Sequence, residues 1–203
     1  MDKTSSSHEP GELEVEAQKE RQAFFDAFYK ETDRGLAIVL VCFLDNMLEK
    51  LIRAVYRKDP RIKILFKDNQ VFQSFYNKVC IAYFSGLIPE PFYDDLKLVG
   101  EIRNRFAHAV LDTVSFNDVS ITQKIDRFKQ LPPEYKNIYP PKLKFLLITV
   151  HMGAFIQGLR YGRLGKGTIK IDDMCNTDLA KLRGCILTPQ EIEKLMKRET
   201  DKQ

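Results

Sequence analysis

Three residues able to take part in phosphate chemistry lie within residues 101–108, which read EIRNRFAH. The guanidinium of Arg103 can stabilise negative charge on a phosphate, and the imidazole of His108 can move protons near neutral pH. Cleavage of RNA by its own 2′-hydroxyl needs both functions and no metal ion. We therefore take Arg103, Asn104 and His108 as candidate catalytic residues of a metal-independent endoribonuclease.

The spacing of these residues sets a geometric condition on such a site. Arg103 and His108 are five residues apart, so on a helix they point about 140° away from each other. Asn104 and His108 are four residues apart and share a face. If two copies of the helix met across a two-fold axis, side chains beside the seam could converge in one cleft. A catalytic site here therefore predicts a homodimer.

Arg103 also has a structural explanation. It lies on the apolar stripe of its helix, whose other members are Phe92, Leu96, Val99, Phe106 and Val110. An unpaired guanidinium in apolar surroundings costs several kcal/mol, so Arg103 must be paired or turned toward a partner or ligand. An ion pair with Asp33, Asp45 or Glu49 of an earlier helix would satisfy it without any function.

His108 and Arg105 have structural explanations of the same kind. His108 could close the end of its helix, where a cation favours the helix dipole and local carbonyls accept hydrogen bonds. Arg105 follows Glu101 by four residues, which favours an ion pair between them on a solvated face.

The elements that carry these residues are predicted to be helices throughout. We expect helices at residues 12–30, 32–59, 71–85, from 89 through the motif, 119–131, 141–162 and from 188 onward. Thr32 is a candidate N-cap, Pro60 ends its helix, and Gly86 is a candidate left-handed C-cap. Asn117 or Asp118 could cap the fifth of these helices. No stretch alternates strongly enough for a sheet, so the predicted class is all-α.

The helix at 32–59 is predicted to be central, because its apolar stripe is unusually broad. One row of apolar residues recurs at four-residue steps: Val39, Phe43, Met47, Leu51 and Val55. A second row widens the stripe: Leu36, Leu40, Leu44 and Leu48. We expect both rows to face the core.

Composition predicts one main domain in a soluble protein. The chain has 203 residues, 44% of them hydrophobic, and a formal net charge of +4. We expect a disordered tail at 1–11, a helical domain at 12–165, and a loop with a capping helix at 166–203. The apolar run at 36–44 is shorter than the roughly 20 residues of a membrane span, and residues 1–16 lack a signal-peptide pattern. We therefore expect a cytoplasmic protein without membrane contact.

The sequence gives no reason to expect a metal ion. Cys42 and Cys80 lie in helical apolar patterns, which favours reduced, buried thiols. Cys175 and Cys185 do not have zinc-site spacing with the distant His151, which we expect to be a satisfied core histidine.

The basic stretch at residues 160–170, RYGRLGKGTIK, does not predict a cofactor either. It lacks the first glycine of a phosphate loop, and Gly167 stands where Ser or Thr should bind magnesium. The stretch is expected to be a solvated loop, or a basic patch that touches RNA or an acidic partner.

Residues 103–108, RNRFAH, resemble the R-polar-xxx-H motif of the HEPN superfamily. That superfamily comprises all-helical proteins that commonly dimerise through the motif-bearing helices, and it includes many toxin and defence ribonucleases. A longer resemblance covers roughly residues 30–130. The blocks ETDRGLAIVLVCFLDNMLEKLI, FYNKVCIAYFSGLI and LVGEIRNRFAH, followed by VSF, are similar to successive blocks of the mannitol operon repressor (MltR-like) family.

The resemblance implies a fold and a role. It implies an HEPN-like or MltR-like helical bundle, here with a C-terminal helical extension. Members of the MltR-like family are named as transcription regulators, which implies a regulatory protein. One departure is that residues 65–72, LFKDNQVF, stand where family members often have a Gly-Pro-Leu-Gly-type loop.

Two functions from different classes therefore stay open. One is a non-enzymatic dimeric regulator that acts through a regulatory protein partner. The other is an HEPN-type endoribonuclease that uses Arg103, Asn104 and His108 on RNA. Direct sequence-specific DNA binding is not expected, because residues 187–199, LTPQEIEKLMKRE, are not followed by a recognition helix.

Overall fold

The described part of the chain is all helical, which confirms the predicted class. The structure is a computed structural model that describes residues 27–56, 60–67, 70–109 and 113–165. The chain divides into two units, residues 1–30 with 187–203 and residues 31–186, and most of the first unit lies outside the described residues. The helices named below belong to the second unit, and no strand occurs in its described part.

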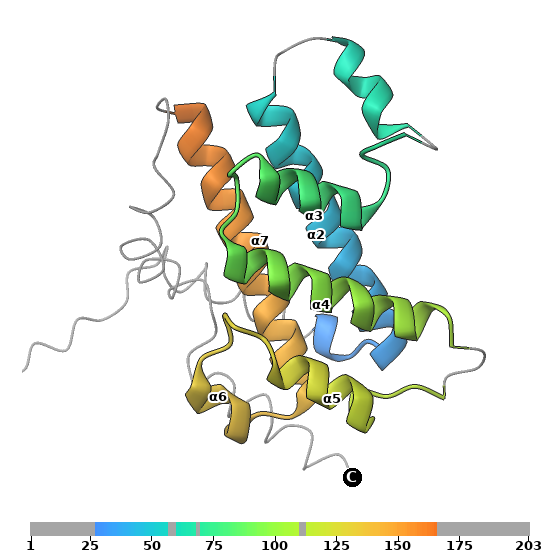
Figure 1. Ribbon diagram of the computed structural model, residues 1–203. Coiled ribbons are helices and arrows are strands. Elements are labelled where there is room, and N and C mark those ends of the chain that lie inside the picture. The colour runs from blue at the N-terminus through green and yellow to red at the C-terminus, as the bar shows by residue number, and fades with distance from the viewer. Residues whose placement is uncertain (1–26, 57–59, 68–69, 110–112, 166–203) are drawn as a thin grey trace, which may run out of the picture. The chain divides into compact units, whose positions relative to one another are not determined.

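Seven elements follow one another along the described chain (Figure 1). They are α2 (Asp33–Val55), the 3₁₀ helix η1 (Pro60–Phe66), α3 (Phe75–Phe84), α4 (Glu90–Ala107), α5 (Val119–Asp126), α6 (Pro133–Ile138) and α7 (Pro141–Gly165). The predicted tail at 1–11, most of the helix at 12–30 and the segment at 166–203 with its helix from residue 188 lie outside the described residues.

The helix ends follow from local side-chain chemistry. The Thr32 hydroxyl accepts a hydrogen bond from the backbone N–H of Gly35 at 3.0 Å, which confirms the predicted N-cap of α2. Ser74 caps α3 in the same way through Asn77 N–H at 3.1 Å, so α3 begins later than predicted. Gly86 follows α3 with φ of 63°, a left-handed conformation that glycine adopts without strain, as expected.

Helix α2 lies at the centre of the bundle. It packs mainly against α7 and α4, and α3 packs across both α2 and α4 (Figure 1). Helix α5 contacts α4 and α7. Four helices, α2, α3, α5 and α7, therefore pack against α4, which carries the candidate motif.

The core of α2 uses the second predicted row of apolar residues. Its four members, Leu36, Leu40, Leu44 and Leu48, are all fully buried. In the first row only Leu51 is fully buried, and the others were wrongly expected to face the core, because Val39 is 43% exposed and Phe43, Met47 and Val55 are only half-buried. Helix α2 makes most of its contacts with α7 and α4.

Helices α2 and α7 approach each other closely at a glycine. A Cβ atom placed on Gly153 of α7 would lie 2.3 Å from the ring of Phe43 on α2. Only a residue without a side chain leaves room for this ring. The contact explains why Phe43 is partly buried although it lies outside the leucine row.

Helix α7 contains the most apolar stretch of the described chain. Residues Pro141–Arg160 are long and apolar enough to cross a membrane, with a mean hydropathy of 1.2. Within this stretch, 72% of the best window is buried against the rest of the protein. The core helix of a soluble bundle has the same properties, so the stretch is weak evidence for a membrane span.

Candidate functional site

Arg103 lies on α4 at the point where α3 stops covering it. Phe75, the first residue of α3, packs against Gly100 so closely that a Cβ there would lie 3.3 Å from its ring. Arg103 follows Gly100 by one helical turn and therefore extends past the start of α3. Arg103 lies on the stripe that helical spacing predicted, but its side chain is half-exposed rather than buried in the core.

Two grooves meet at Arg103. The α3–α4 groove has a volume of about 360 Å³, and its lining includes Tyr76, Val79, Lys97, Gly100, Arg103 and Asn104. The α2–α3 groove has a volume of about 380 Å³, and its lining includes Val41, Cys42, Asp45, Ser74, Phe75 and Arg103. Within the described residues, Arg103 makes no hydrogen bond or ion pair. Its guanidinium is therefore a solvent-accessible cation that has no counter-ion among the described residues.

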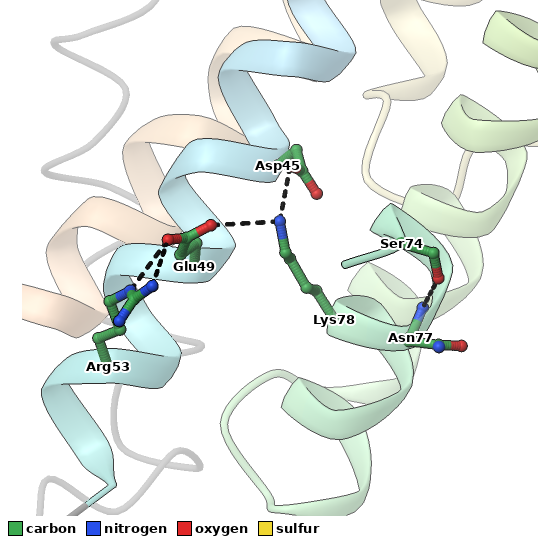
Figure 2. A network of polar contacts seen from close by, with 6 residues as sticks. All are labelled: Asp45, Glu49, Arg53, Ser74, Asn77 and Lys78. Carbon is green, nitrogen blue, oxygen red and sulfur yellow. Dashed lines mark hydrogen bonds and ion pairs between the residues drawn. The ribbon is translucent and has the colours of Figure 1, made fainter. Parts of the chain in front are cut away.

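The acids predicted to pair with Arg103 are occupied by another cation (Figure 2). Lys78 of α3 is only 4% exposed at its side chain and lies 2.7 Å from Asp45 and 3.4 Å from Glu49. Glu49 also pairs with Arg53 at 2.9 Å. The prediction that Arg103 pairs with Asp45 or Glu49 was therefore wrong, because Lys78 of α3 pairs with both carboxylates, although Asp45 lines the α2–α3 groove together with Arg103.

The third predicted partner, Asp33, also has other contacts. Its Oδ2 accepts hydrogen bonds from the Ser115 hydroxyl and the Phe116 N–H, each at 3.0 Å. Its Oδ1 lies 3.5 Å from the Lys142 ammonium. Asp33 therefore fastens the segment after α4 to the start of α2 and α7, and it is not a partner of Arg103.

His108 is the residue that ends α4. Its backbone N–H donates a hydrogen bond to the backbone carbonyl of Asn104 at 3.0 Å, and its side chain is exposed. The carbonyls at this helix end accept instead from Arg34, whose guanidinium lies 3.4 Å from both Ala107 O and Ala109 O. The C-terminal position predicted for His108 is confirmed, but Arg34 supplies the cation that meets the carbonyls.

The predicted ion pair between Glu101 and Arg105 does not form. Glu101 forms an ion pair with Lys124 of α5 rather than with Arg105. Arg105 is exposed and makes no ion pair within the described residues. Asn104 is exposed and lines the α3–α4 groove beside Arg103.

One chain therefore assembles only part of a ribonuclease site. Arg103 and Asn104 share a groove in which an anion could be held by charge and hydrogen bonds. His108 lines neither groove, in agreement with its predicted angular separation from Arg103. A general base and a charge-stabilising arginine would act on one phosphate only if a second chain supplied one of them.

The other residues considered for chemistry lie apart from this site. Cys42 is exposed, contrary to prediction, and Cys80 is half-buried; both thiols are free. Cys175 and Cys185, like the basic stretch beyond residue 165, lie outside the described residues. Where the structure describes the chain, no three or more His, Cys, Asp or Glu residues are grouped so as to hold a metal ion.

His151 is a core residue of α7, as predicted, but it is not fully satisfied. It is 9% exposed, its ring lies 5.9 Å from that of Phe92, and its Nδ1 has no hydrogen-bond partner in the described structure. Burial lowers the pKa of His151 below its ordinary value of 6.5. Burial therefore favours the neutral form of this histidine.

Comparison of the chain with models of known protein families, with curated proteins and with solved structures gives no match. The arrangement of the residues themselves must therefore carry any functional argument.

Two residues that define the site were missed by reasoning from sequence. Lys78 lies one residue before Val79 and three after Phe75, so its spacing already placed it on the buried stripe of α3. Arg34 could not be found in this way, because its acceptors lie more than seventy residues away in the chain.

Proposed function

We propose that the protein is a non-enzymatic regulatory protein that forms a homodimer through the last turns of α4, with Arg103, Asn104 and His108 at the contact. The observation that carries the proposal is Arg103, a half-exposed cation that has no ion pair within the described residues and lines two grooves. The predicted partners Asp45 and Glu49 pair with Lys78 instead, and Asp45, whose Oδ1 has no hydrogen-bond partner in the described structure, lines the same groove as Arg103.

The chemistry of this surface suits a protein contact. Arginine is enriched in protein interfaces because its planar fork makes several directed hydrogen bonds. Asn104 and His108 share one side of α4, and each is exposed and able to hydrogen-bond across a two-fold axis. The resemblance of α2, α3 and α4 to the MltR-like family supports a regulatory role in the cytoplasm through a further protein partner.

Sedimentation equilibrium tests the dimer. We expect the wild type to have twice the mass of the chain and Arg103→Glu to shift toward the monomer mass. Lys50→Glu is the matched control, because it makes the same charge change at an exposed residue of α2, outside the proposed contact, and should leave the mass unchanged. A monomeric wild type at all concentrations, or equal effects of the two variants, would contradict the proposal.

A second candidate function is the metal-independent endoribonuclease. It is favoured by the side chains of Arg103 and His108, neither of which has a partner within the described residues. In a dimer, His108 would take the proton of the RNA 2′-hydroxyl while Arg103 stabilises the charge that develops on the phosphate. Attack by the 2′-oxygen breaks the bond to the 5′-oxygen, which takes up a proton, and leaves a 2′,3′-cyclic phosphate.

Incubation with RNA in EDTA separates this candidate from the regulator. Cleavage by the wild type, with cyclic phosphate ends, should vanish in His108→Ala and in Arg103→Ala but persist in Arg105→Ala. The His108→Ala protein should remain folded and dimeric. Absence of cleavage across RNAs of varied sequence would exclude the ribonuclease and leave the regulator intact.

A further inference from the structure

Four aromatic side chains form a row on the outer face of α3 and the first half of α4. Phe84 meets Tyr83 edge to face at 5.3 Å between ring centroids, and Tyr83 stacks on Tyr93 of α4 at 4.5 Å. Tyr76 precedes Tyr83 by seven residues, or two helical turns, so it lies on the same side of α3, and the neighbouring Cys80 and Tyr93 raise its pKa. Phe84, Tyr83, Tyr93 and Tyr76 are called the aromatic row below.

The two ends of the aromatic row are exposed far more than packing requires. The Phe84 side chain is 77% exposed and Tyr76 is 54% exposed, while Tyr83 and Tyr93 between them are half-buried. The inner rings hold the row rigid, and the outer rings offer apolar surface to solvent. Rigid exposed aromatic rings are efficient stacking surfaces, because little conformational entropy is lost when a planar ligand binds.

Lys97 is a cation beside the aromatic row that forms no ion pair within the described residues. Its ammonium lies 5.2 Å from the centroid of the Tyr93 ring. Two acids near it are paired, Asp94 with Lys129 and Glu101 with Lys124, while Glu90 at the start of α4 is exposed. A ligand that approaches the row at Lys97 therefore meets a cation whose acidic neighbours are neutralised, which favours an anionic ligand.

We propose that the aromatic row and Lys97 bind a short segment of single-stranded nucleic acid. Bases stack on Tyr76 and Phe84, and the phosphates between them lie against Lys97. Tyr76 and Phe84 are eight residues apart on α3, or about 12 Å along the helix axis, which is room for a few nucleotides. Exposed aromatic rings beside unpaired cations are the combination that binds single strands without sequence preference.

Other occupants fit these observations less well. A second copy of the chain bound at this surface would place its own Lys97 near the Lys97 of the first copy, and the two like charges would repel each other. An acidic peptide would satisfy the charge but has no planar groups to match the rings. The proposal goes beyond the proposed function, because the aromatic row lies on α3 and the first half of α4, whereas the predicted dimer contact uses the last turns of α4.

Fluorescence anisotropy of labelled oligouridylate and oligothymidylate, each of about 12 nucleotides, tests the proposal with the full chain in EDTA at low salt. We expect both strands to bind, and Tyr76→Ala and Phe84→Ala each to weaken binding about tenfold, the loss of one stacked base. Tyr76→Phe keeps the ring and should keep binding. Lys97→Gln should weaken binding and reduce the salt dependence by about one charge.

Two matched controls show whether the aromatic row itself is the site. Val119→Ala removes an apolar side chain that is 71% exposed on α5, and Arg105→Gln removes a cation from a different side of α4. Neither should change binding. Equal losses in these variants, or competition by polyglutamate as strong as by oligouridylate, would show a charge-only surface and overturn the proposal.

The remaining outcomes separate the proposal from the dimer. If neither strand binds at low salt, the proposal is overturned. That result would not contradict a wild-type dimer observed by sedimentation. A loss of dimer mass in Tyr76→Ala or Phe84→Ala would make the aromatic row a self-interface and would also overturn the proposal. Binding lost in these two variants at unchanged mass supports it. Binding of oligouridylate alone would restrict the ligand to RNA.

Discussion

Lys78 and Arg103 are both cations on core-facing stripes of neighbouring helices, but only Lys78 is paired. Lys78 is buried and contacts two carboxylates of α2, whereas Arg103 is half-exposed and has no partner within the described residues. A charge that is removed from water must be paired if the bundle is to be stable. The difference indicates that Lys78 serves the fold and that Arg103 is free to serve binding.

The same contrast separates the two sides of α4. On the side of α5, Asp95 is fully buried, and each of its carboxylate oxygens accepts a backbone N–H, from Lys129 and Gln130, both at 2.8 Å. On the side of α3, Lys97, Arg103 and Asn104 face open grooves. Substitutions on the first side should therefore change stability, and those on the second side should change binding.

The largest loss of stability is expected for Asp95→Ala. The change leaves two buried N–H groups without an acceptor and should lower the free energy of unfolding by about 3 kcal/mol. Asp94→Ala is the matched control, since it removes a neighbouring carboxylate whose ion pair with Lys129 is largely exposed, and it should cost about 0.5 kcal/mol. Urea denaturation measures both values. Similar losses in the two variants would show that burial of Asp95 does not decide its contribution.

Lys78→Met should have the next largest effect. Methionine keeps the apolar stem but leaves Asp45 and Glu49 without their shared cation, at a cost of about 2 kcal/mol. The figure is below that for a wholly buried pair, because the two carboxylates are 31% and 32% exposed. Lys129→Met breaks an exposed pair and should leave the unfolding free energy nearly unchanged. A stable Lys78→Met variant would remove the contrast between Lys78 and Arg103.

A smaller, pH-dependent effect is expected from His151, which is buried like Lys78 but lacks a partner at Nδ1. Because burial lowers its pKa in the folded state, the unfolded chain takes up a proton first as the pH falls below about 6.5. The free energy of unfolding is therefore highest above about pH 6.5 and falls as the pH is lowered. His151→Leu should therefore gain stability relative to the wild type between pH 7 and pH 5. A difference that is the same at both values would refute the assignment.

Much of the fold could be predicted because the signals that begin, continue and end its helices lie between residues that are close in sequence. The four-residue spacing of the leucines in α2, the Thr32 cap and the Gly86 turn each act within a few residues of sequence. Which row of α2 faces the core could not be predicted, since α7 and α4 lie far along the chain and their directions of approach decide it. The row that contains Val39 had an equally regular spacing, and only Leu51 of that row is fully buried.

The site was predictable in its residues and not in its contacts. The spacing correctly put Arg103 on the apolar stripe and His108 about 140° away, because both statements depend only on helix geometry. The choice of Lys78 as partner of Asp45 and Glu49, and of Arg34 at the end of α4, depends on distances between separate helices. Sequence spacing within one helix contains no information about such distances.

The smallest change in stability is expected for Arg103→Leu, and this variant tests the comparison most sharply. No ion pair is lost, and leucine continues the apolar stripe of Leu96, Val99 and Phe106, so the free energy of unfolding should stay within about 0.5 kcal/mol of the wild type or rise. Arg53→Leu is the control, because Arg53 both pairs with Glu49 and lies 3.8 Å over the Phe66 ring, and it should lose about 1 kcal/mol. A loss from Arg103→Leu as large as that from Lys78→Met would mean that Arg103 also serves the fold. A stable Arg103→Leu variant that no longer dimerises would show that this arginine is used for binding and not for folding.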